Sequence, residues 1–135
     1  MTKKELKSFL SAWNKYNELY QKYCNKNRVP FPEPLQKEIV KTFYDKNLVV
    51  SNNSSYDFQG NIELKSSTQP GGGCTPFEKT QSACSRIIYL EIGKNIDVYE
   101  ISPADVKIIN ALVANKNVNI TLSNYKKNAK HKNII

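Results

Sequence analysis

The chain has few of the side chains that thiol and imidazole chemistry require. Its 135 residues include three cysteines, Cys24, Cys74 and Cys84, and a single histidine, His131. An odd number of cysteines without zinc-site spacing argues against a disulfide framework and against structural zinc. A nucleophilic cysteine needs a basic partner, and the single histidine lies in a lysine-rich stretch late in the sequence. We therefore expect no cysteine-based catalysis.

Long apolar runs are also missing. No segment approaches the roughly 20 apolar residues that a membrane-spanning helix needs, and residues 1–6 lack the apolar core of a signal peptide. We therefore expect a cytoplasmic protein that does not contact a membrane.

The length suits one domain over residues 1–135. We expect a helical N-terminal part (1–46), a sheet with the candidate site (47–101), and a helix, strand and basic tail (102–135).

Acidic side chains are outnumbered by basic ones. The chain has 20 Lys and Arg against 12 Asp and Glu, which gives a formal net charge of +8. A positive charge of this size suits a polyanionic partner such as nucleic acid. Solvated surface lysines would give the same composition, so the charge alone does not identify the partner.

The pattern of apolar residues predicts four helices. Residues 3–25 repeat apolar side chains every three or four positions, which is typical of an amphipathic helix. A second helix is expected from Pro34 to about residue 44, because proline is favourable in the first helical turn. Ser102 and Pro103 predict the N-cap and first turn of a helix that ends near residue 115. A short helix is expected at residues 77–84.

Strands are predicted where short apolar runs end in turn-forming residues. These runs are residues 48–50, 55–58, 62–65, 86–92, 96–101 and 118–122, with a turn at residues 93–95. Residues 66–76 contain three consecutive glycines and predict either a flexible segment that orders on DNA or a surface loop, and residues 125–132 predict a basic tail. The order of elements favours a mixed β-sheet flanked by helices in an α/β domain.

The segment from residue 55 to residue 65 carries the most specific prediction. Its two halves alternate apolar and polar residues around Gln59-Gly60-Asn61, and Gly and Asn both tolerate positive φ. A turn at these three residues would pair Phe58 with Ile62 in a tight β-hairpin. A slip of one residue would move one strand's side chains to the other face, so this register decides which side chains meet.

In that register, Asp57 lies opposite Glu63, with Lys65 on the same face. The apolar face would consist of Tyr56, Phe58, Ile62 and Leu64.

Two facing carboxylates repel each other unless a cation lies between them. Mg²⁺ suits this position, since it is typically held by one or two carboxylates together with waters and phosphate oxygens. Lys65 beside the ion would orient or deprotonate a water, or stabilise charge that develops on the phosphate. The pattern therefore predicts Mg²⁺-dependent cleavage of phosphodiesters by Asp57, Glu63 and Lys65. A solvent-exposed hairpin face that is merely charged is the alternative.

The same residues resemble the active-site motif of the PD-(D/E)XK nuclease superfamily, with Asp57 followed after five residues by Glu63-Leu64-Lys65. Segments before and after the motif are similar, in order, to a group of small type II restriction endonucleases. These segments are residues 32–40, 75–79, 86–92 and 98–101. The resemblance spans roughly residues 28–106 and implies a restriction-endonuclease-like fold, a mixed sheet flanked by helices.

The resemblance also implies roles for individual residues. The two carboxylates of the motif and the Leu64 carbonyl would bind Mg²⁺, and Lys65 would be the catalytic lysine. A glutamate on the preceding helix often supports such a metal site, and Glu38 or Glu33 matches it. These two lie five residues apart and point in different directions, and we favour Glu38. The first position of the motif is occupied here by Tyr56.

The expected function is that of a type II restriction endonuclease, which hydrolyses double-stranded DNA at a short specific site. Such enzymes commonly act as homodimers, because their two-fold symmetry matches that of a palindromic site. Alternatives are a structure-specific repair nuclease with the same site and a non-catalytic DNA-binding protein on the nuclease fold. The candidates for contact with DNA, each of which is equally consistent with plain surface, are Ser66, Ser67, Gln69, Lys79 and Gln81.

Overall fold

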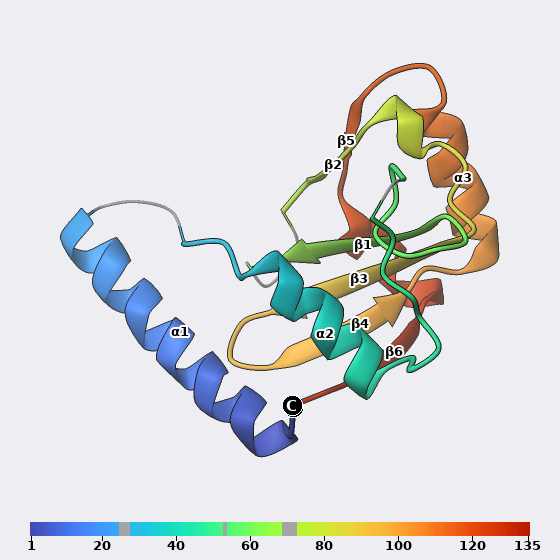
Figure 1. The fold of residues 1–135 in the computed structure, drawn as a ribbon. Coiled ribbons are helices and arrows are strands. Elements are labelled where there is room, and N and C mark those ends of the chain that lie inside the picture. Colours follow the sequence, from blue (N-terminus) through green and yellow to red (C-terminus); the bar gives the residue numbers. More distant parts are fainter. Residues whose placement is uncertain (25–27, 53, 69–72) are drawn as a thin grey trace.

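A four-stranded mixed sheet forms the centre of the computed structural model, which describes residues 1–135 except 25–27, 53 and 69–72 (Figure 1). The order across the sheet is β1 (Ile62–Ser67), β3 (Arg86–Ile92), β4 (Ile96–Glu100) and β6 (Lys130–Asn133). β1 lies at one edge and runs parallel to β3, whereas the other neighbours are antiparallel. A two-stranded antiparallel ribbon joins β2 (Thr75–Phe77) to β5 (Val118–Ile120).

Helices flank this sheet and confirm the predicted mixed α/β class. The α-helices of the described residues are α1 (Lys3–Cys24), α2 (Glu33–Phe43) and α3 (Pro103–Val113). Short 3₁₀ helices are formed by η1 (Lys79–Gln81) and η2 (Leu122–Asn128). Ser102 caps α3 as predicted, since its Oγ accepts a hydrogen bond from the Asp105 N–H. Within the described parts of the chain, no helix combines the length and apolarity that crossing a bilayer would take.

Two hydrophobic cores cover the two faces of the sheet. Strand β3 contributes side chains to both cores, because successive side chains of a strand point to opposite faces. Ile88 and Leu90 pack in the first core with buried residues of α1 and α2, whereas Ile87 and Tyr89 pack in the second core with residues of α3. A strand buried on both faces reads as a continuous apolar run, which is what residues 86–92 show.

The predicted hairpin is confirmed at its first pair, Phe58 with Ile62, whereas residues 55–57 form bends rather than a strand paired with β1. Phe58 forms antiparallel bridges both to Ile62 and to Val50, and its side chain is fully buried in the first core. The turn uses the expected residues, because Gly60 and Asn61 have φ of 85° and 60°. The predicted strand at residues 48–50 is reduced to the single bridge at Val50.

Tyr56 departs from the prediction, which placed it on the apolar face with Phe58. Its ring packs in the second core instead, and its hydroxyl accepts a hydrogen bond from the Ala83 N–H. The reason is local, since residues 54–57 form bends rather than a strand and the Ser54 hydroxyl bonds the backbone of Tyr56. Side chains of these residues therefore do not alternate between two faces.

The predicted basic tail at residues 125–132 is wrong. Residues 125–128 belong to η2 and residues 130–132 to β6, which completes the sheet beside β4. All four β6 residues are exposed, so the strand lacks the apolar alternation by which strands are recognised. The predicted short helix at residues 77–84 is confirmed only over Lys79–Gln81, as a 3₁₀ helix, because Thr75–Phe77 pairs as β2. For the correctly predicted helices and the longer strands, the ends differ by at most two residues.

An ionic network joins the sheet to the end of α2. Arg86 binds Glu100 through two hydrogen bonds of 2.7 and 2.8 Å and binds Asp45 through a third of 2.9 Å. The Tyr44 hydroxyl donates a further bond to Glu100. Burial opposes ionisation of Glu100, but the hydrogen bonds from Arg86 and Tyr44 outweigh it and lower the pKa of this carboxyl. The pKa of Asp45 is lowered by hydrogen bonds from the Asn47 N–H and Arg86.

This network predicts a loss of stability in acid. The pKa of Glu100 is lower in the folded chain than in the unfolded chain, so its contribution is present above the ordinary glutamate value of 4.5 and disappears as pH falls below it. We expect the melting temperature of the wild type to fall more steeply between pH 5 and pH 3, roughly, than that of Glu100→Gln. The exposed Glu5→Gln variant is the control and should follow the wild type. Parallel curves for all three proteins would contradict this role of Glu100.

Candidate active site

A cavity of about 430 Å³ opens beside the edge strand β1. Residues from the start of α2, from β1 and from the β2–η1 segment line it, so elements distant in sequence meet there. Asp57, Glu63 and Lys65 are all among the lining residues. The structure therefore brings together the three side chains that the sequence singled out.

Asp57 and Glu63 contact each other at the inner end of this cavity. Glu63 is only 2% exposed, although it is a carboxylic acid on a strand. Its Oε2 is buried and receives no hydrogen bond from the described residues. A buried carboxylate oxygen without a donor is costly unless the acid is protonated or bound to a cation.

The two carboxyl groups titrate as a pair that shares a proton. Burial, followed by the hydrogen bond and the charge of Asp57, raises the pKa of Glu63 to about 9. Burial also opposes ionisation of Asp57, but hydrogen bonds from Glu63 and the Leu64 N–H, together with Lys37, hold its pKa below the ordinary value. The pair therefore carries one negative charge at neutral pH, and a divalent cation could take the place of the proton.

The backbone of Leu64 completes the inner wall of the site. Its N–H donates a 2.9 Å hydrogen bond to Asp57 Oδ2. In a β-strand, the N–H and C=O of one residue point to the same side. The pattern is visible two residues earlier, where both backbone groups of Ile62 bond Phe58. The Leu64 carbonyl consequently points to the open edge of β1, the side on which Asp57 lies.

Lys65 reaches the cavity from the same face of β1 as Glu63. Its Nζ lies 4.6 Å from the centroid of the Phe77 ring and 3.5 Å from Gln81 Oε1. Its charge lowers the pKa of Glu63 against the larger effect of burial. Among the described residues it has no carboxylate partner within 4 Å, so its ammonium group is available to an anionic ligand.

Lys37 of α2 is a cation of the site that sequence reasoning missed. Its Nζ lies 3.4 Å from Asp57 Oδ1 and 3.5 Å from Glu33 Oε1. The chain has many lysines, and nothing local marks this one except its four-residue spacing from Glu33. Its contact with Asp57 depends on α2 packing across the hairpin, which only the tertiary structure reveals.

The placement of the helix glutamates is opposite to the favoured prediction. Glu33 lines the cavity, whereas Glu38 does not. Glu38 is exposed on α2 and accepts a hydrogen bond from Thr42, one turn further along the helix. Because α2 begins at Glu33, its first turn is the part nearest the cavity, and Glu38 lies more than a turn away.

The residues predicted to contact DNA are spread around the cavity. Ser66 and Gln81 line it, but the Gln81 amide is already bonded to Ser55 and to the Glu78 N–H. Ser67 is buried and its Oγ accepts a bond from the Gly73 N–H. Lys79 is exposed at the start of η1. Gln69 lies outside the described residues.

The side chains present fit a divalent cation bound by two carboxylates rather than a fully enclosed metal centre. In the described ranges, no three His, Cys, Asp or Glu side chains gather closely enough to hold a metal by themselves. The paired carboxyls, the donor-free Glu63 Oε2 and the open edge at Leu64 match the preference of Mg²⁺ for a few protein oxygens plus water.

Comparisons with known proteins do not extend this interpretation. No model of a known protein family matches the chain, and no curated protein or solved structure is significantly similar to it.

Proposed function

We propose that the chain is a Mg²⁺-dependent endonuclease of the restriction type, with a restriction-endonuclease-like fold, which cuts double-stranded DNA. The observation that carries the proposal is the contact between Asp57 and the buried Glu63 in an open cavity that also holds Lys65. A fold does not gain stability from a buried acid pair with a raised pKa, so such a pair indicates function.

In this proposal, the residues of the cavity have separate roles in phosphodiester hydrolysis. The Asp57 and Glu63 carboxylates and the Leu64 carbonyl would hold Mg²⁺. When bound, the ion supplies charge neutralisation at the phosphate and activation of the attacking water. Lys65 stabilises the negative charge that develops on the phosphate oxygens or orients the water. Lys37 adds to the hydrogen bonds from Glu63 and the Leu64 N–H in lowering the pKa of Asp57, which favours the ionised form that binds a cation.

The partners follow from the same proposal. The substrate is double-stranded DNA with a short palindromic site, and the enzyme acts as a homodimer whose two-fold axis coincides with that of the site. The net charge of +8 suits binding to a polyanion. As a restriction enzyme it would work in the cytoplasm.

Incubation of long unmethylated DNA with the protein and Mg²⁺ tests the proposal. We expect a fixed set of fragments whose ends map to one short sequence. Lys65→Ala should reduce the rate by about 100-fold or more, since a positioned charge at the transition state has effects of this order. Cleavage of only branched or single-stranded DNA would identify a structure-specific nuclease instead. Absence of cleavage, or full activity in Lys65→Ala, would contradict the assignment.

A further inference from the structure

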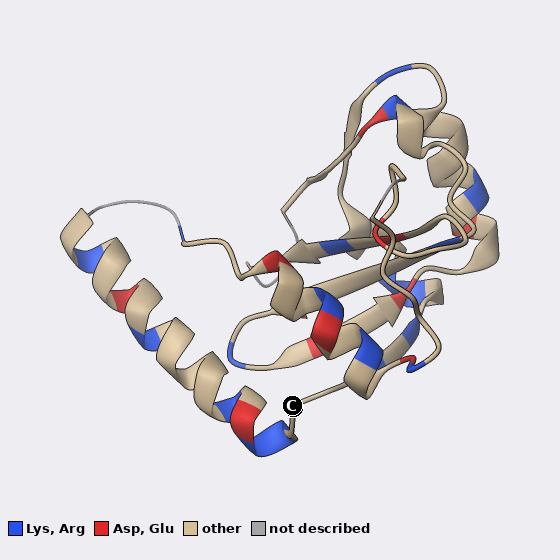
Figure 2. Cartoon of the chain, viewed as in Figure 1, with Lys and Arg blue, Asp and Glu red and all other residues tan. Residues whose placement is uncertain are grey.

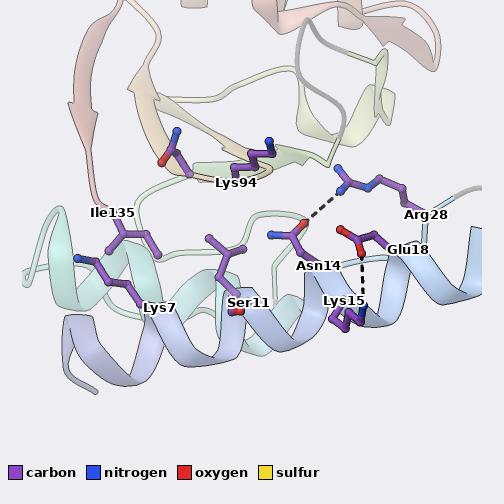
Figure 3. Close-up of a pocket in the computed structure, with 10 residues that line it drawn as sticks. Lys7, Ser11, Asn14, Lys15, Glu18, Arg28, Lys94 and Ile135 are labelled. Atoms are coloured by element: carbon purple, nitrogen blue, oxygen red, sulfur yellow. Dashed lines mark hydrogen bonds and ion pairs between the residues drawn. The ribbon is translucent and has the colours of Figure 1, made fainter.

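A second cavity, of about 550 Å³, lies between α1 and the β3–β4 turn (Figure 3). Basic side chains from three segments line it: Lys7 and Lys15 of α1, Arg28, and Lys94 of the turn. The single acidic side chain in the lining is Glu18, whose charge is paired with Lys15 at 3.9 Å. We call this region the α1 groove.

Arg28 is held in place by neutral partners. Its guanidinium donates to the Thr68 carbonyl at 2.6 Å and to Asn14 Oδ1 at 3.1 Å, and it lies 5.2 Å from the centroid of the Trp13 ring. None of these groups neutralises its charge, and among the described residues no carboxylate pairs with it. Only two of the five N–H donors of a guanidinium are used by these bonds. A positioned guanidinium whose charge no described carboxylate neutralises, and three of whose N–H donors are unused by these two bonds, is suited to bind an anion.

The opposite wall of the groove is fixed by the same residue that orients Arg28. Asn14 donates from Nδ2 to the Gly93 carbonyl at 2.9 Å. Lys94 follows directly in the turn, so Asn14 connects the backbone of this turn to the Arg28 guanidinium. Lys94 and Lys7 are exposed and have no carboxylate partner among the described residues.

The length of the α1 groove indicates an extended ligand. Lys7 and Asn14, where Arg28 is bound, lie seven residues apart on α1, which is about 10 Å along the helix axis. One phosphate cannot contact both ends of this span. A nucleic-acid strand carries a phosphate every 3.4 Å or so along the helix axis, and its backbone can contact both ends at once. Figure 2 shows basic positions both along α1 and at the turn that faces it.

The α1 groove also adjoins the candidate active site. Arg28 bonds Thr68, which directly follows β1, and Pro30 and Phe31 line the cavity of Asp57 and Glu63. A strand that leaves the active site past this segment would therefore meet Arg28 next. We propose that the α1 groove binds the phosphate backbone of the nucleic acid beyond the site of cleavage. This inference shares with the proposed function the assumption that the ligand is a nucleic acid.

Binding of a duplex in the presence of EDTA tests the proposal without cleavage. The test variant is Lys7→Ala/Lys94→Ala, and the matched control is Lys107→Ala/Lys116→Ala, two exposed lysines of α3 and the segment that follows it. Both double variants remove two charges from exposed positions, and equal melting temperatures would show that both fold. We expect the Kd of the test variant to rise on the order of tenfold at about 0.1 M salt. The slope of log K against log salt concentration should become less negative by nearly 2, since each lost phosphate contact removes about 0.9.

The outcomes separate this proposal from the proposed function. A control variant that binds within about twofold of the wild type supports the groove, since charges beyond the Debye length are screened. Equal weakening in both double variants would show that only net charge matters and would overturn it. Displacement of the duplex by inorganic phosphate at matched ionic strength would indicate a small-anion site and would also overturn it. If groove-dependent binding is found but Mg²⁺ gives no cleavage, the groove stands and the nuclease assignment fails.

Discussion

Replacing Glu63 by glutamine is expected to abolish Mg²⁺-dependent cleavage of DNA while leaving the fold intact. Glutamine removes an anionic oxygen that would bind the cation and cannot be deprotonated. A loss on the order of 1,000-fold corresponds to about 4 kcal/mol of barrier, which is the scale of stabilisation by a metal ion. The rate of duplex cleavage under single-turnover conditions measures this directly.

The same substitution should not destabilise the metal-free protein. Because burial and the neighbouring Asp57 raise the pKa of Glu63, the metal-free protein favours its protonated form, which glutamine resembles in shape and polarity. We expect the melting temperature of Glu63→Gln to equal or exceed that of the wild type. A drop of several degrees would show that Glu63 has a structural role. Glu38→Gln is the matched control, because Glu38 lies on exposed α2 surface outside the cavity, and it should cleave at the wild-type rate.

Replacing Phe58 by alanine is expected to have the largest effect on stability. Phe58 is fully buried, and its backbone bridges both Val50 and Ile62. Loss of a buried phenylalanine side chain costs about 3–5 kcal/mol, which is a large part of the 5–15 kcal/mol that holds a typical domain together. Chemical denaturation followed by Trp13 fluorescence or circular dichroism would measure the change.

A variant in the second core distinguishes a general loss of stability from a loss of the cation site at Asp57 and Glu63. Ile109 of α3 is also fully buried, but it packs in the second core. Ile109→Ala should cost about 2–5 kcal/mol and leave the hairpin register unchanged. At a temperature where both variants are folded, we expect Phe58→Ala to lose divalent-cation binding and Ile109→Ala to keep it. Equal binding by both would mean that Phe58 does not position Asp57 against Glu63.

The hairpin was predictable because all of its signals are local. Gly60 and Asn61 supply the positive φ that a tight turn needs, and the turn pairs Phe58 with Ile62 as predicted. Asp57 contacts Glu63 as predicted but not through a continued strand pairing, because residues 54–57 form bends and the Leu64 N–H holds Asp57 by a hydrogen bond. Strand β3 and helix α3 were likewise predicted from a continuous apolar run and from a serine cap, which act within a few residues.

The parts that could not be predicted depend on contacts distant in sequence. β6 has four exposed polar residues, and it is a strand because it pairs with β4 and because His131 stacks on Tyr99 with 4.6 Å between ring centroids. β2 likewise exists only through its pairing with β5. The contact of Lys37 with Asp57, and the presence of Glu33 rather than Glu38 at the cavity, depend on how α2 crosses the hairpin. No pattern within a single segment encodes these arrangements.

Calorimetric titration with Mg²⁺ or Mn²⁺ tests most directly whether Asp57 and Glu63 form a cation site. The structure pairs the two carboxyls at an open cavity and leaves Glu63 Oε2 without a donor among the described residues. We expect the wild type and Glu38→Gln to bind one divalent cation per chain, and Glu63→Gln and Asp57→Asn to show no binding. Absence of binding in the wild type, or unchanged binding in Glu63→Gln, would contradict the account.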